Sequence, residues 1–434
     1  MITFIAVAFG SFLLLLASGM WVAIAAALVG MAVLFVTTGW DNMLLASSWV
    51  IWVSVDSFVL TAIPLFIFMG QILMQSGLGA RIYTAVEPTL NHFPGGLLYT
   101  NIVAGALFAA CTGSSSASAA TIGSVAFPEM DKRGYPPSMS AGSVGAGAVL
   151  APIIPPSILL IFYASITEQS IGRLFAAGVI PGLILVVLFL IYITIRFRFY
   201  GHWGEHKGEV LPWKTSLART KDVWLVFALI VMVLGSIFAG IATPTEAAAV
   251  GSFGAILLAG LHRRLSWQML RNSVFGVFRI NCALMFIMFG VKIMTAAFAR
   301  AGLVHYATQV LLDLSVPSLV VLLIIYGVFL ILGTMIEGIP LMLMVVPVVF
   351  PTIIALGYDP IWFGLAVTLL QATGNFTPPV GVTLFALQAL RPERPVTEIY
   401  RGLIPFTIAV LVLLAIITAF PQLVMILPNA MLGE

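Results

Sequence analysis

A run of small polar residues in the first half of the chain could bind a hard cation. Residues 112–118 contain Gly113 and three adjacent serines, Ser114, Ser115 and Ser116. Such residues let the backbone turn, and the freed carbonyls and hydroxyls are oxygen ligands that suit Na⁺. The alternative is a seam of small residues between packed helices. A serine-hydrolase site is excluded, because the last position of its G-x-S-x-G motif would fall on an alanine.

A proline cluster downstream predicts a break inside a membrane span. Three prolines fall within five residues, at Pro152, Pro155 and Pro156, and Ser157 follows them. Proline removes backbone N–H donors, so carbonyls about one turn earlier lose their partners, which is costly in lipid. A bound cation would compensate for this loss. The alternative is an ordinary proline kink satisfied by water or by Ser157.

The second half of the chain contains a counterpart of each feature. Residues 333–340 form the second predicted turn, and residues 374–381 form the second predicted break. If turn and break meet in each half, they create two related oxygen cages with a substrate cavity between them. Glu337 is the one carboxylate at a turn, where it could ligate a cation, bind a proton or form a buried ion pair with Lys292.

These counterparts belong to an internal repeat. Residues 127–162 and residues 350–385 share nine identities in 36 aligned positions at a constant offset of 223, without gaps. The offset places Pro155-Pro156 on Pro378-Pro379. It also places the first turn on the second. The chain is therefore predicted to contain two copies of one structural unit.

The composition requires a membrane environment. Apolar residues make up 61% of the 434 residues and charged residues only 8%, whereas a soluble domain has about 25% charged residues. A soluble enzyme, a nucleic-acid binder and a disordered chain are excluded. The two cysteines have no metal-type spacing and predict no disulfide framework.

Apolar runs predict about ten full crossings and two re-entrant hairpins. The hairpins are 95–131 and 317–354, because each is too long for one crossing and has a polar or Gly-rich patch at its middle. The predicted crossings are 3–17, 20–37, 56–78, 138–170, 175–195, 223–241, 245–261, 280–299, 361–390 and 402–427.

The placement of basic residues predicts the orientation. With both termini outside, 16 of the 19 Lys and Arg residues face one compartment, which the positive-inside rule makes the cytoplasm. The first hairpin then opens inward and the second outward. Five crossings separate the hairpins, and an odd number inverts one repeat relative to the other. Inverted repeats with broken helices are typical of secondary transporters.

These observations predict an all-α polytopic membrane protein with two inverted-topology repeats. Residues 1–195 form the first repeat, with the inward-opening hairpin 95–131 and the broken helix 138–170. Residues 196–222 form a basic cytoplasmic linker that contacts lipid head groups. Residues 223–434 form the second repeat, with the outward-opening hairpin 317–354 and the broken helix 361–390.

Six short motifs, in order, resemble the large membrane subunit of tripartite ATP-independent periplasmic (TRAP) transporters. They are Gly113-Ser114, Gly134-Tyr135, residues 153–157, residues 180–182, residues 242–249 and residues 377–381. Together they cover the chain from about Phe58 to its end. The second turn is a looser match, because Gly338 stands where the family pattern has proline.

The resemblance implies an elevator-type carrier, and not an enzyme, in the bacterial inner membrane. It implies Na⁺ symport of a small organic acid through about two Na⁺ sites. The expected partners are a periplasmic substrate-binding protein (DctP-type) and a small four-helix membrane subunit (DctQ-type), with no role for nucleic acid. The alternative is a stand-alone Na⁺- or H⁺-coupled carrier or antiporter of related fold.

Carried over residue by residue, the resemblance implies one Na⁺ site in each half. The expected Na⁺ ligands are Gly113, Ser114, Ser115, Pro152, Ile153 and Ile154 in the first half, and Thr334, Gly338, Pro378 and Gly381 in the second. The expected substrate contacts are Ser116, Ser157, Glu337, Thr377 and Pro379.

Overall fold

The chain is helical throughout the part that the structure describes. The structure is a computed structural model, and it describes residues 2–200, 212–213, 215–216, 220–313, 316–377 and 381–431. No β-strand occurs in these ranges. Six helical segments among them are long and apolar enough to cross a membrane: 58–75, 171–199, 244–261, 267–300, 338–355 and 396–419. The prediction of an all-α polytopic fold is confirmed.

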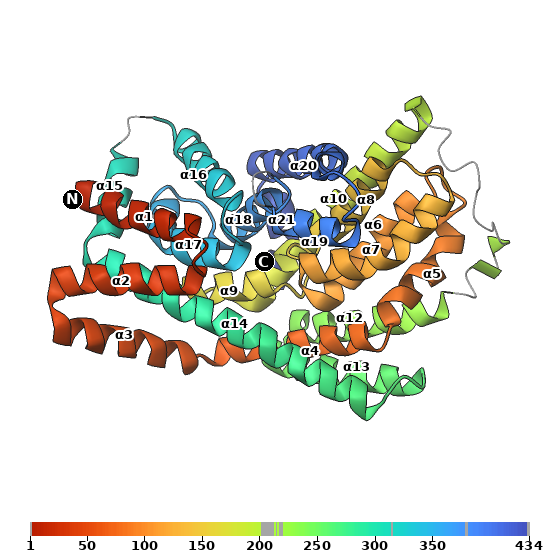
Figure 1. Cartoon of the computed structure of the whole chain (residues 1–434), viewed down its shortest axis with the longest axis horizontal. Coiled ribbons are helices and arrows are strands. Elements are labelled where there is room, and N and C mark those ends of the chain that lie inside the picture. The colour runs from red at the N-terminus through yellow and green to blue at the C-terminus, as the bar shows by residue number, and fades with distance from the viewer. Residues whose placement is uncertain are drawn as a thin grey trace.

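The first half of the chain is a continuous series of helices (Figure 1). They are α1 (Ile2–Ala17), α2 (Val22–Thr38), α3 (Trp40–Val55), the 3₁₀ helix η1 (Phe58–Thr61), α4 (Ala62–Gln75), α5 (Leu78–Leu90), α6 (Leu97–Thr112), α7 (Ser115–Lys132), α8 (Pro137–Val149), α9 (Ile158–Thr167) and α10 (Ile171–Tyr200). The predicted linker 196–222 begins inside α10, and most of it lies outside the described residues.

The second half follows the same plan. Its helices are α12 (Lys221–Phe238), α13 (Pro244–Leu261), α14 (Trp267–Arg300), α15 (Leu303–Leu312), α16 (Ser318–Gly333), α17 (Gly338–Ala355), α18 (Pro360–Gly374), α19 (Val382–Leu390), α20 (Val396–Ala419) and α21 (Gln422–Ala430). The bounds of α7, shifted by the sequence offset of 223, coincide with those of α17. The helix boundaries therefore repeat together with the sequence.

Three helices differ from the predicted crossings. The run 402–427 is divided between α20 and α21, because Pro421 cannot donate a backbone hydrogen bond and disfavours helix at Phe420. The run 280–299 is only part of α14, which begins at Trp267. Arg271 and Arg279 made its first turns look too polar to cross; Arg271 lies 5.5 Å from the Phe275 ring centroid. Helix α3 was not expected.

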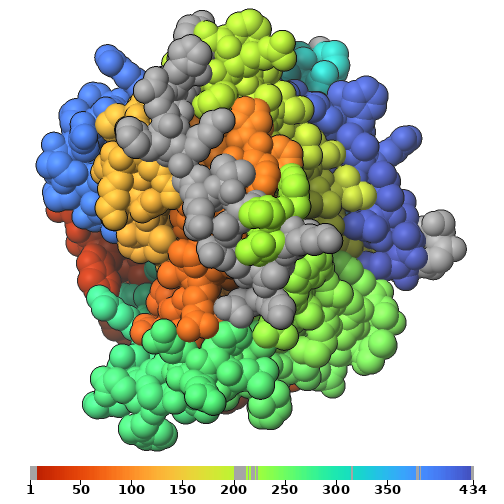
Figure 2. Space-filling view, turned by 90° about the vertical axis from the view of Figure 1, so that its right-hand side faces the viewer, coloured from red at the N-terminus to blue at the C-terminus, as the bar shows by residue number. Residues whose placement is uncertain are grey.

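Each half completes the packing of the other. Helix α2 packs on α14, and α13 packs on α4; α7 packs on α19, and α17 packs on α9. The second contact of each pair is the first shifted by the sequence offset. Figure 2 shows helices of both halves, coloured from orange to blue, side by side on one face. The two halves therefore share one core.

Glycine permits the closest of these contacts. A Cβ atom on Gly402 of α20 would lie 1.9 Å from the Ser138 carbonyl oxygen of α8. A Cβ atom on Gly290 of α14 would lie 2.0 Å from the Ala23 carbonyl oxygen of α2. Membrane helices associate mainly through such close packing, because lipid supplies no hydrophobic force between them.

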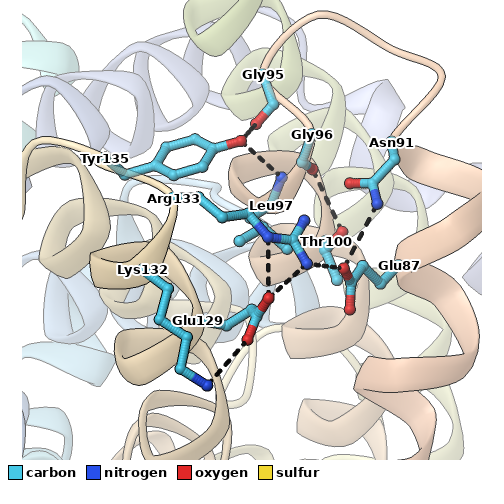
Figure 3. Close-up of polar contacts among 10 residues, drawn as sticks. All are labelled: Glu87, Asn91, Gly95, Gly96, Leu97, Thr100, Glu129, Lys132, Arg133 and Tyr135. Atoms are coloured by element: carbon cyan, nitrogen blue, oxygen red, sulfur yellow. Dashed lines mark hydrogen bonds and ion pairs between the residues drawn. The ribbon is translucent and has the colours of Figure 1, made fainter. Parts of the chain in front are cut away.

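Ion pairs fix the base of the first hairpin. The Arg133 guanidinium lies between the carboxylates of Glu87 and Glu129, with 2.6 Å between its Nη2 and Glu129 Oε1 (Figure 3). The Tyr135 hydroxyl donates to the Gly95 carbonyl at 3.4 Å. These contacts join the end of α7 to the end of α5 and the loop before α6. The base is therefore held while the turn between α6 and α7 extends into the protein.

A second ion pair joins the two halves at the end of α19. The Arg391 guanidinium is 3% exposed and pairs with Asp131 at the end of α7. The same guanidinium lies 4.3 Å from the Phe127 ring centroid. The pair therefore holds the contact between α7 and α19.

We expect Asp131→Asn to destabilise the protein by about 2 kcal/mol, because it leaves a buried guanidinium without an ionised partner. The exposed half of Asp131 keeps this loss below that of a fully buried pair. Thermal unfolding in detergent measures the effect. Glu398→Gln is the control, since its pair with Arg394 is wider, at 3.9 Å, and partly exposed. Equal unfolding temperatures for the two variants would contradict the role of Asp131.

Candidate functional site

The first hairpin turns at the predicted glycine. Gly113 has a φ of 58°, in the left-handed region, and ends α6. The Ser114 hydroxyl caps α7 by accepting from the Ala117 N–H at 3.4 Å, and it lies 3.2 Å from the Ser116 hydroxyl. A Cβ atom on Gly113 would lie 3.2 Å from the Pro156 carbonyl oxygen. The turn of the first hairpin therefore contacts the first break.

The first break is an irregular segment between α8 and α9. The Ser157 hydroxyl donates to the Pro152 carbonyl at 2.7 Å and accepts from the Leu160 N–H at 3.3 Å, which makes it the N-cap of α9. A Cβ atom on Gly178 would lie 2.3 Å from the Ile153 carbonyl oxygen, so this oxygen lies against α10. Ser157 and Ile153 thus have structural partners of their own.

The second hairpin turns between α16 and α17. The Thr334 hydroxyl donates to the Ile331 carbonyl at 2.8 Å, and Glu337 is the N-cap residue of α17. A Cβ atom on Gly374 at the end of α18 would lie 2.6 Å from the Gly333 carbonyl oxygen. The turn of the second hairpin therefore contacts the helix that leads into the second break.

The second break lies between α18 and α19. Gly381 has a φ of 51°, and a Cβ atom on it would lie 3.1 Å from the Asn375 carbonyl oxygen and 3.6 Å from that of Thr377. The Thr377 hydroxyl donates to the Thr373 carbonyl at 2.8 Å. Main-chain oxygens thus gather around Gly381. The predicted site residues Pro378 and Pro379 lie outside the described residues.

A cavity of about 570 Å³ lies where both hairpins and both breaks meet. Seven of the predicted site residues line it: Gly113, Ser114, Ser115, Ser116, Pro152, Glu337 and Gly338. Ile153, Ile154, Ser157, Thr334, Thr377 and Gly381 belong to the turns and breaks but are not among its lining residues. The opposite wall comes from α4 and α14, through residues such as Gly70, Gln71, Ile280 and Leu284.

Helix ends give the cavity its electrostatic character. The first turns of α7, α9, α17 and α19 line it, through Ser115, Ile158, Gly338 and Thr383. Helix N-termini carry partial positive charge and favour anions. The last turns of α6 and α18 also reach the cavity, at Thr112 and Gln371, and they supply carbonyl oxygens, which favour cations. The cavity can therefore bind an anion and a cation together.

The donors around the cavity suit Na⁺. Within the described ranges, no three His, Cys, Asp or Glu side chains cluster as ligands of a metal ion. The groups available are serine hydroxyls, main-chain carbonyls and the Glu337 carboxylate. Hard cations prefer such oxygen ligands, whereas transition metals prefer imidazole and thiolate.

Four polar residues of the cavity were not predicted as site residues. They are Gln71, Gln371, Asn375 and Thr383. Gln71 and Gln371 each interrupt an apolar run, which is the signal that marks a functional polar residue in a membrane helix. Gln371 is 1% exposed, and neither atom of its side-chain amide has a hydrogen-bond partner within the protein.

Lys292 and Glu337 do not form the ion pair considered for them. Lys292 lines a different cavity of about 390 Å³, between α3, α9, α14 and α17, and Glu337 lines the first cavity. The segment 243–246 has the structural role that its sequence indicates. Thr243 and Glu246 form a capping box at the start of α13.

Comparisons with known proteins identify the family. The model of the tripartite ATP-independent periplasmic transporter, DctM component, matches residues 9–423. The sialic acid TRAP transporter large permease protein SiaM of Vibrio cholerae is 31% identical over 380 residues, which are 87% of this chain and 88% of that protein. The C4-dicarboxylate TRAP transporter large permease protein DctM of Pseudomonas aeruginosa is 32% identical over 375 residues, with 86% and 87% covered.

A solved structure shares the fold. The YdaH transporter of Alcanivorax borkumensis superposes with a TM-score of 0.62 at 15% identity, over 90% of this chain and 91% of that one. The relatives are transporter permeases and not enzymes, as the sequence predicts. The chain is a multi-pass membrane protein and belongs to the DctM component family, the large permease subunits of TRAP transporters.

Proposed function

We propose that this chain carries a small organic acid across the bacterial inner membrane in symport with Na⁺. A periplasmic substrate-binding protein of DctP type delivers the acid, and a small four-helix subunit of DctQ type braces the scaffold helices. The observation that carries the proposal is the single cavity in which both hairpin turns, both helix breaks and four helix N-termini meet. The sialic acid and C4-dicarboxylate relatives support an acidic substrate.

Each half holds one Na⁺ in this proposal. In the first half the ligands come from the turn at Gly113 to Ser115 and from the break at Pro152 to Ile154. In the second half they come from Thr334, Gly338, Pro378 and Gly381. Bound Na⁺ brings the turns and breaks into the geometry that binds the acid, because the carbonyls of a broken helix otherwise lack partners. Ion gradients supply the energy.

The transport motion is an elevator movement of the hairpins and broken helices past α4 and α14. The packing supports this division, because the cavity has the turns and breaks on one side and α4 and α14 on the other. A Cβ atom on Gly70 of α4 would lie 2.8 Å from the Cys111 carbonyl oxygen beside the first turn. Such a smooth contact between backbones lets one surface slide along the other.

The orientation follows from the charges. The basic residues at the ends of α7, α10, α13 and α19 lie on the cytoplasmic side, and both termini are periplasmic. The first hairpin then opens toward the cytoplasm and the second toward the periplasm. The two halves thus have inverted topology, which alternating access requires of a symmetric carrier.

Uptake into proteoliposomes tests this function. We expect acid to accumulate only with an inward Na⁺ gradient, and only when the chain, its small subunit and the loaded binding protein are all present. Replacing Na⁺ by K⁺ at the same ionic strength is the control. Uptake that follows a proton gradient, or that needs the chain alone, would overturn the proposal and favour a stand-alone carrier.

A further inference from the structure

The side-chain amide of Gln371 is exposed to the cavity and has no partner in the protein. Gln371 lies in the last turn of α18, is 1% exposed, and lines the cavity. Neither its Oε1 nor its Nε2 has a hydrogen-bond partner. A buried amide without partners is destabilising, so native proteins rarely retain one unless a ligand or water completes it.

The amide lies beside the second hairpin turn. A Cβ atom on Gly338 would lie 3.0 Å from Gln371 Cγ and 3.4 Å from its Nε2. Gly338 directly follows Glu337, whose side chain also lines the cavity. One wall of the cavity therefore offers a carboxylate and a complete amide. An amide both donates and accepts, whereas an ionised carboxylate only accepts.

The charges of the cavity limit the ligand further. Glu337 is the only charged side chain among the lining residues, and no Lys, Arg or His is among them. A bound carboxylate must therefore be balanced by helix N-termini and Na⁺. Two Na⁺ ions and one ionised Glu337 leave a single positive charge, which matches one carboxylate. A dicarboxylate would leave an unbalanced negative charge in a site of low polarity, and such burial is costly.

We propose that Gln371 positions the substrate and that Gln371 and Glu337 together select a monocarboxylic acid that carries hydroxyl or amide groups. The carboxylate faces the helix N-termini and Na⁺, and the hydroxyl or amide groups bond to Gln371 and Glu337. The inference rests on the proposed Na⁺-coupled function. It separates this chain from a carrier of C4-dicarboxylates.

Ligand-induced thermal stabilisation of the purified chain tests the inference without a binding protein. The probes are gluconate, which is a hydroxylated monocarboxylate, hexanoate, which lacks the hydroxyls, and succinate, which is a dicarboxylate. Each is titrated in NaCl and in KCl. We expect gluconate to stabilise the protein in NaCl, with hexanoate and succinate binding at least about tenfold more weakly.

Variants then identify the residues responsible. Gln371→Leu should weaken gluconate binding about tenfold, since it removes both hydrogen-bonding atoms at similar size. Glu337→Gln removes the repelling charge and should strengthen succinate binding about tenfold. Gln309→Leu, on exposed α15, is the control and should bind gluconate as the unmodified protein does. Gln371→Asn, which keeps a shorter amide, should bind with intermediate affinity.

The outcomes separate this inference from the Na⁺ proposal. Stabilisation by NaCl that persists in Gln371→Leu shows that the variant is folded and its Na⁺ sites intact. Equal gluconate affinity in Gln371→Leu and Gln309→Leu would overturn the role of Gln371. Tight succinate binding by the unmodified chain would overturn the charge argument. A chain that responds equally to NaCl and KCl would instead contradict Na⁺ coupling itself.

Discussion

Gly402→Ala is expected to prevent normal folding of the chain. Its added Cβ atom would lie 1.9 Å from the Ser138 carbonyl oxygen and 2.7 Å from the carbonyl carbon. Both are backbone atoms of the other half, so no side chain can move aside, and α8 and α20 must separate. We expect a loss of more than about 3 kcal/mol, at the upper end of overpacking effects.

The measurement is the monodisperse yield and unfolding temperature of the detergent-solubilised chain. Gly327→Ala in α16 is the matched control, because no atom lies within 4 Å of its added Cβ. In that helix alanine should be neutral or slightly stabilising, since it is the better helix former. The account of the interface between the halves is contradicted if Gly402→Ala unfolds at the temperature of Gly327→Ala.

Gly113→Ala is expected to weaken Na⁺ binding at least about tenfold. Alanine at a φ of 58° costs about 1 kcal/mol, and its Cβ atom would lie 3.2 Å from the Pro156 carbonyl oxygen. The first turn must then move away from the first break, which separates the proposed ligands of one Na⁺ site. The readout is the Na⁺ concentration that gives half-maximal thermal stabilisation.

Gly134→Ala separates backbone strain from the effect on the site. Gly134 also has a positive φ, of 71°, but no atom lies within 4 Å of its added Cβ. This variant should lose some stability and keep its Na⁺ affinity. If both variants keep full Na⁺ affinity, the turn at Gly113 does not contribute to a Na⁺ site.

The sequence predicts the broken elements well, because backbone rules govern them. The turn at Gly113 needs a left-handed residue, and the segment from Pro152 to Pro156 cannot remain helical. Both effects are local, so the residue types suffice. The same holds for the capping box at Thr243, and the break at Pro421 shows how a missed local rule divides a long apolar run into two helices.

The sequence predicts less well what depends on packing between distant segments. Ser157 looked like a substrate ligand, yet its hydroxyl caps α9 and bonds to the Pro152 carbonyl. Gln371 looked like one polar residue in an apolar run, and only the fold shows that its amide reaches the cavity without a partner. Helix α3 was missed because Asp41, Asn42 and two serines lower its apolar character.

Equilibrium binding of radioactive sodium to the purified chain tests the central claim most directly. That claim is that each half uses a hairpin turn and a helix break to hold one Na⁺. The account predicts saturable binding of about two Na⁺ per chain, with one site weakened in Gly113→Ala and both retained in Gly134→Ala. Binding that does not saturate, or that is unchanged in Gly113→Ala, would contradict it.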